Sequence, residues 1–128
     1  MAVITQQHEN VRMPDEVWEK TADYFETILV PAIQQIDGDV EQTTLNGTPV
    51  LALGGESFVA ATRLGMAFRL SGKARYKAWA LDGSKLWDPT LKPDHTPRQE
   101  WVIVRYIFKH NWLDFARQAL THVQKQTV

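Results

Sequence analysis

The residues best suited to chemistry stand far apart in this sequence of 128 residues. No two histidines are separated by four positions, the spacing with which one helix presents a pair of metal ligands. His95, which lies in a proline-rich stretch, is better explained as a solvated loop residue than as a general base. The four are His8, His95, His110 and His122. The chain has no cysteine, which excludes disulfides, thiolate nucleophiles and cysteine-bound metals within it.

Three short patterns begin like catalytic or binding motifs and stop short. Gly55–Val59 starts as a nucleophile elbow but lacks the final glycine and falls at a predicted hairpin. The pair Gly54-Gly55 precedes a strand, whereas a phosphate loop needs a helix N-terminus behind it. Aspartates recur every six residues from Asp82 to Asp94, without the glycine and glutamate of a calcium loop. We therefore expect a protein that is not an enzyme and has no metal and no cofactor.

Two features remain as candidate binding surfaces. The first is a cationic rim where the predicted strands lead into a second helix, made of Arg63, Arg69, Lys73, Arg75 and Lys77. Such a run is ordinarily a solvated face, and binding of phosphate or of an acidic partner is the alternative. The second lies at the proline loop, where Trp87, expected to be partly exposed, and Arg98 would anchor a partner.

Charge is divided unevenly along the chain, although the net charge is only −1. Residues 1–64 carry three Lys or Arg against ten Asp or Glu, and residues 65–128 carry eleven against five. The simpler interpretation is that an acidic helix and a basic half complement each other in one fold. The alternative is a basic face for nucleic acid or an acidic partner. Nucleic acid is not favoured, because domains that bind it usually have a positive balance.

The N-terminal sequence has no basic region followed by an apolar run, so no export signal is expected. No apolar run approaches the ~20 residues that span a bilayer. We predict a cytoplasmic protein without a membrane partner, with a flexible tail at residues 1–13 and one domain at 14–128.

The first predicted element is a helix that begins at Pro14 and ends at Asp37-Gly38. Pro31 removes one backbone hydrogen bond from it, which predicts a kink or break near Val30. Its apolar positions alternate in steps of four and three, which places them on one buried face. These positions are Trp18, Ala22, Phe25, Leu29, Ala32 and Ile36.

Four short strands are predicted across Thr43–Leu70, with turns at Asn46-Gly47, Gly54-Gly55 and Leu64-Gly65. In the third strand, alternation places Phe58 and Ala60 on the same side. The second strand, Pro49–Leu53, is apolar on both sides and therefore needs cover on both.

The second half continues with a helix over Gly72–Leu81, whose Tyr76, Trp79 and Ala80 are expected to turn partly inward. An edge strand (Lys85–Trp87), a loop (Asp88–Arg98), a strand (Gln99–Tyr106) and a helix (Asn111–Gln124) complete the prediction. Runs of neighbouring strands favour antiparallel pairing, so the fold class is α+β. We expect two layers, an antiparallel sheet with helices packed on it, in the order α-β3/4-α-β2-α.

Four segments carry a family resemblance: Leu45–Pro49, Ser57–Ala61, Met66–Leu70 and Arg98–Val104. Together they resemble the TfoX (Sxy) N-terminal-domain-like family and, more distantly, the MmcQ/YjbR group. The resemblance implies a domain like those of secretion chaperones and a role in transcriptional regulation.

Three functions follow as expectations. The first is a non-enzymatic interaction or regulatory module with a protein partner or a second copy, which would cover the doubly apolar strands. The second is direct nucleic-acid binding through the basic half. The third is a small-ligand domain with a pocket between the proline loop and the sheet.

Overall fold

The computed structural model describes residues 15–87, 89 and 98–126. The predicted tail at 1–13, the helix start at Pro14 and nearly all of the loop at 88–98 lie outside these residues.

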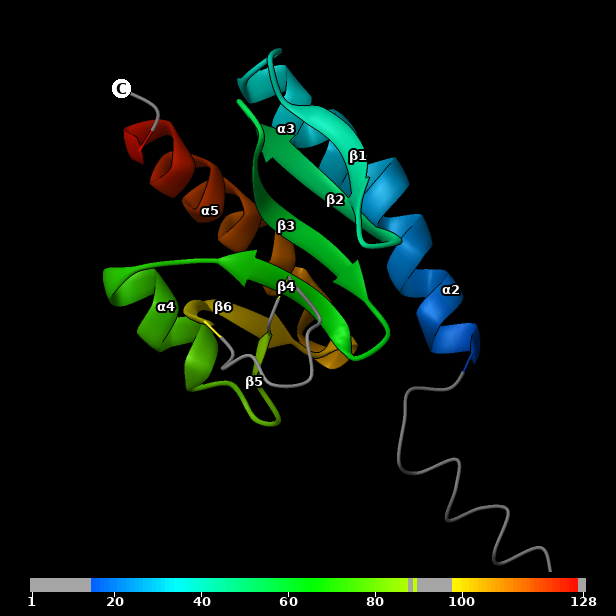
Figure 1. Cartoon of the computed structure of the whole chain (residues 1–128). Helices are drawn as coiled ribbons and strands as arrows, with labels where there is room; N and C mark the ends of the chain where they lie inside the picture. The colour runs from blue at the N-terminus through cyan, green and yellow to red at the C-terminus, as the bar shows by residue number, and fades with distance from the viewer. Residues whose placement is uncertain (1–14, 88, 90–97, 127–128) are drawn as a thin grey trace, which may run out of the picture.

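One antiparallel sheet with helices packed on it forms the fold, which confirms the predicted α+β class. The strand order is β1-β2-β3-β4-β6-β5, so β1 and β5 are the two edges. Figure 1 shows α2, α3 and α5 behind the sheet and α4 beyond the end of β4. The strands are β1 (Glu41–Leu45), β2 (Thr48–Leu53), β3 (Glu56–Thr62), β4 (Gly65–Arg69), β5 (Lys85–Trp87) and β6 (Arg98–Val104). Within the described ranges, no helix combines the length and the apolar character needed to cross a bilayer.

The first helical stretch runs without a break through α2 (Asp15–Tyr24), the π-helical turn η1 (Phe25–Leu29) and α3 (Val30–Ile36). The break predicted as one possibility near Val30 is absent, and the helix instead contains this π turn, in which the Val30 N–H donates to the Phe25 carbonyl five residues earlier. Pro31 follows directly; it has no N–H to donate, and its ring would crowd the preceding turn of an ideal α-helix. The wider π turn accommodates both effects while the helix continues.

The π turn also changes which side chains are buried. Fully buried positions recur every four residues, at Thr21, Phe25, Leu29 and Ile33. A four-residue spacing drifts by about 40° per step around an α-helix. A π turn takes one residue more than an α turn, so it cancels much of that drift and brings Ile33 to the sheet. The prediction that Ile36 is buried is therefore wrong, since Ile36 is 54% exposed.

The four-stranded meander is confirmed, and its tight turns follow from backbone conformation. Asn46 and Gly47 have φ values of 52° and 81°, and Gly54 and Gly55 have φ values of 58° and 83°. Two successive residues with positive φ make a type I′ hairpin turn, which matches the twist of the flanking strands.

The alternation predicted for β3 is wrong, because a β-bulge interrupts it. Leu51 pairs with Val59 and Ala52 pairs with Ser57, so Phe58 is the extra residue on its strand. Phe58 and Val59 both belong to the core under the helices, while Ala60 belongs to the opposite face.

The main core lies between the sheet and the helices α2, η1, α3 and α5 (Trp112–Gln126). Every side chain predicted to be buried in the last helix is buried there: Trp112, Phe115, Ala116, Ala119, Leu120 and Val123. The 3₁₀-helix η2 (Tyr106–Asn111), which joins β6 to α5, was not predicted.

The second face of the sheet is filled by the chain's own side chains. It comprises Val50, Ala60, Ala67, Trp87, Trp101 and Ile103, with Leu45 packed against them. The indoles of Trp87 and Trp101 meet edge to face, with ring centroids 4.9 Å apart. The doubly apolar strands are thus buried on both sides without a second copy.

A long-range hydrogen bond shows how strongly the sheet curls around this face. Five strand spacings would separate β1 and β5 by about 24 Å in a flat sheet. Yet Asn46, at the β1–β2 turn, donates from Nδ2 to the carbonyl of Pro89, 3.0 Å away and two residues past β5. The sheet therefore bends its two edges toward each other over the tryptophan pair.

Candidate functional site

The helix α4 (Gly72–Trp79) presents the most exposed aromatic and cationic surface of the predicted site. Tyr76 is 69% exposed and Ala80 is exposed as well, so the prediction that these residues turn partly inward is wrong for both. Trp79 is 46% exposed, so about half of its surface is covered. Only Ala78 of this helix is fully buried, with Ala74 and Leu81 partly buried against the main core. These three positions are spaced four and three residues apart, so they form the inner face, to which α4 itself contributes only the small side chains of Ala74 and Ala78.

The two lysines of α4 take part in no ion pair within the described residues. Lys73 and Lys77 are exposed and lie one helical turn apart, about 6 Å along the axis. The guanidinium carbon of Arg75 lies 6.0 Å from the centroid of the Tyr76 ring. No acidic residue occurs from 71 to 81. We call the exposed set Lys73, Tyr76, Lys77 and Trp79, together with Arg75, the α4 surface.

Arg69 does not join the α4 surface, although the sequence grouped it there. Its side chain is 12% exposed, and its Nη1 lies 2.9 Å from Glu56 Oε2. Its Nε lies 3.2 Å from Glu100 Oε1, and the other oxygen of that carboxylate lies 3.7 Å from His122 Nε2. Arg69 therefore ties β4 to β3 and β6 and is already occupied by two carboxylates.

The remaining predicted residues lie elsewhere. Arg63 is in the turn at the far end of β4, with its guanidinium carbon 5.4 Å from the Trp18 ring centroid. The prediction that Trp87 is partly exposed is wrong, since it is 8% exposed beside Trp101. The side chain of Arg98 lies outside the described part of the chain. Of the predicted set, the structure brings together Lys73, Arg75 and Lys77.

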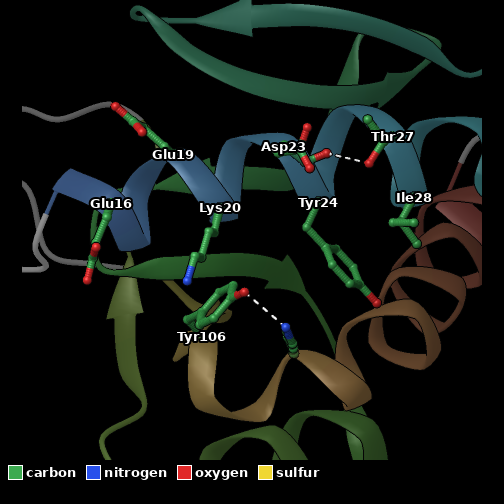
Figure 2. A pocket seen from close by; sticks show the side chains of 9 residues that line it. Glu16, Glu19, Lys20, Asp23, Tyr24, Thr27, Ile28 and Tyr106 are labelled. Atoms are coloured by element: carbon green, nitrogen blue, oxygen red, sulfur yellow. Dashed lines mark hydrogen bonds between the residues drawn. The ribbon is translucent and has the colours of Figure 1, made fainter.

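A groove of about 500 Å³ lies between the first helix and η2, as Figure 2 shows. Lys20 and Tyr24 extend from α2 toward η2, whereas Glu19 and Asp23 project from the rim. Its lining residues are Glu16, Glu19, Lys20, Asp23, Tyr24, Thr27, Ile28, Tyr106 and Lys109.

The groove contains hydrogen-bonding groups beside a cluster of aromatic rings. Lys109 Nζ donates to the Tyr106 hydroxyl over 3.0 Å (Figure 2). Tyr24 and Tyr106 each meet the buried Trp112 edge to face, with centroids 5.4 and 5.7 Å from it. Amine, phenol and carboxylate groups here can bind polar ligands.

The sequence did not point to this groove, because its walls are about 80 residues apart in the chain. Tyr106 was predicted to end a strand but starts η2, and Lys109 had no predicted role. The ligand pocket predicted beside the proline loop falls largely on residues outside the described ones.

Two histidines, His8 and His95, lie outside the described residues. Within residues 15–87 and 98–126, no group of three or more His, Cys, Asp or Glu residues is placed to hold a metal ion.

No protein-family model, curated protein or solved structure matches this chain. The resemblance to the TfoX N-terminal-domain-like family, and the regulatory role it implies, stay predictions.

Proposed function

We propose that this protein is a non-enzymatic interaction module that binds an acidic protein surface through α4. The observation that carries the proposal is that α4 presents two exposed lysines and two exposed aromatic rings, without an acidic residue from 71 to 81. Tryptophan and tyrosine are enriched at the energetic centres of protein interfaces. The adjacent cations give the surface its preference for acidic partners.

The second face of the sheet, by contrast, offers no docking surface of comparable quality among the described residues. Its apolar side chains are 0–8% exposed and fill the curved face themselves. The sequence suggested a partner that covers the doubly apolar strands. We instead propose that a partner binds at α4. A regulatory role, as the family resemblance implies, is compatible with such a module.

The test is binding of a labelled 20-residue peptide of glutamate and alanine, measured by fluorescence anisotropy at low salt. We expect binding that weakens as salt is added, and at least a 10-fold loss in the double variant Lys73→Glu/Lys77→Glu. The matched control is Arg117→Glu/Lys125→Glu, which changes the net charge equally at two exposed positions of α5. This control should stay within about 2-fold of the unaltered protein.

Equal binding by the α4 variant and the unaltered protein would overturn the proposal. A single-stranded oligothymidylate of the same charge serves as the competing probe, because stacking on Tyr76 and Trp79 also suits bases. Tighter binding of the oligonucleotide than of the peptide would replace the protein partner with nucleic acid.

A further inference from the structure

A second exposed helix face carries the charges that α4 lacks. Glu19, Asp23 and Glu26 are exposed and follow one another at spacings of four and three residues. They therefore form one acidic stripe along α2 and η1. Glu19 and Asp23 of this stripe also line the groove in Figure 2. We call Glu19, Asp23 and Glu26 the α2 stripe.

The α2 stripe and the α4 surface match in spacing as well as in sign. Glu19 and Asp23 are one helical turn apart, about 6 Å, and so are Lys73 and Lys77. None of these four side chains takes part in an ion pair within the described residues. Two helices laid side by side could pair both carboxylates with both ammonium groups.

The two faces cannot meet within one molecule. α4 packs on β6 and α5, while α2 packs on β3 and β4, and Figure 1 shows α2 and α4 on opposite sides of the fold. Complementary charges on opposite sides of one chain are joined only when two copies come together.

We infer that the acidic partner of α4 is a second copy of this chain, whose α2 stripe receives the α4 surface of its neighbour. This inference rests on the proposed function, because it names the partner of the same surface. Tyr76 and Trp79 would then pack beside the groove rim, where Ile28 of the neighbour is 43% exposed.

The geometry makes the contact heterologous. The copy that binds through its α4 surface still has an unoccupied α2 stripe, and its neighbour, bound through the α2 stripe, still has an unoccupied α4 surface. Further copies can therefore add head to tail. The contact depends on exposed charges, so it weakens as the Debye length falls from about 10 Å at 0.1 M salt to about 3 Å at 1 M.

The experiment is sedimentation equilibrium of the full chain over a range of protein concentrations at about 20 mM and about 500 mM salt. We expect a weight-average mass that rises above 14.6 kDa with concentration at low salt and returns to it at high salt. The variants Lys73→Glu/Lys77→Glu and Glu19→Lys/Asp23→Lys should each stay monomeric. Their equimolar mixture should associate again, because both of its contacts then join opposite charges. Arg117→Glu/Lys125→Glu should associate like the unaltered protein.

Circular dichroism checks that every variant is folded. If a charge-reversed variant is unfolded, the matching neutral variant, Lys73→Gln/Lys77→Gln or Glu19→Gln/Asp23→Asn, is used in its place. The neutral pairs should each raise the dissociation constant at least 3-fold.

A monomer at every low-salt concentration would overturn the inference, as would a mixture of reversed variants that fails to associate. Loss of association in the α4 variant but not in the α2 variant would also overturn it. Any of these results, with the acidic peptide still bound through α4, leaves the proposed function standing. Loss of peptide binding as well removes both.

Discussion

Replacement of Trp87 by alanine tests whether the chain itself closes the second face of its sheet. The indole is 8% exposed, lies at the sheet edge and meets Trp101 edge to face at 4.9 Å. Truncation of a buried tryptophan costs about 3–5 kcal/mol of unfolding free energy. The lost aromatic pair accounts for about 0.5–1.5 kcal/mol beyond area burial alone. We expect a loss of about 4 kcal/mol, a large part of the 5–15 kcal/mol of an ordinary domain.

The assay is urea unfolding followed by far-ultraviolet circular dichroism, with thermal unfolding alongside. With a slope of about 2 kcal/mol per molar urea, the midpoint should fall by about 2 M. At about 3–5 °C per kcal/mol, the Tm should fall by about 12–20 °C.

Trp79→Ala is the matched control, since that indole is 46% exposed on α4. It should change the unfolding free energy by less than about 1 kcal/mol. A Trp87→Ala loss below about 1 kcal/mol, or one equal to that of Trp79→Ala, would refute the view that this face is filled from within.

Two further perturbations follow from local geometry. Gly65→Ala should destabilise the fold by more than about 2 kcal/mol, because its new Cβ would collide with the Val104 carbonyl, whose carbon lies 3.0 Å away. Gly55→Ala also places a non-glycine residue at positive φ, but its new Cβ would meet open space. In the same urea titration it should lower the unfolding free energy by only about 1 kcal/mol. Equal losses of unfolding free energy in Gly65→Ala and Gly55→Ala would contradict this reasoning. Asp37 has a pKa below its usual 3.8, because the Gln124 amide, which it contacts at 3.0 Å, and the Asp39 N–H donate to its carboxylate. Because the pKa of Asp37 is lower in the folded state, its ionised carboxylate stabilises the fold above pH 3.8, and this stabilisation is lost as the pH falls through the folded pKa. The Tm difference between the unaltered protein and Gln124→Ala should therefore shrink when the pH is lowered from 7 to 3. A difference independent of pH would show that the bond to Gln124 does not act through the Asp37 charge.

Local signals predicted most of the fold. The Asn46-Gly47 and Gly54-Gly55 turns were found because few residues tolerate positive φ, so their identity reports the backbone directly. The buried face of α5 was found because its apolar period matches an undistorted α-helix. Both signals lie within a few residues of the feature they specify.

The two errors about which way a side chain faces, at Ile36 and within β3, share one physical cause, an extra residue inside a regular element. The π turn after Phe25 and the bulge at Phe58 each shift the side-chain phase, so residues beyond them face differently from what a constant period predicts. The sequence marks the first only through Pro31 and does not mark the second.

Only part of the binding site could be predicted, because exposure depends on contacts between distant segments. The cations of α4 were found from their spacing, but Tyr76 is exposed because α4 meets the core only through small residues. Arg69 seemed equivalent to them until Glu56 and Glu100, from two other strands, were seen to neutralise it.

The π turn has a consequence for comparing this chain with any homologue. An α-helix with one residue fewer between Phe25 and Val30 would keep the same side chains toward the sheet, because the buried positions would then follow the ordinary steps of four and three. The turn thus behaves as a single-residue insertion, and an alignment should open its gap among the exposed residues Glu26, Thr27 and Ile28. An alignment that runs ungapped through this helix would pair the buried Ile33 with a solvent-facing position.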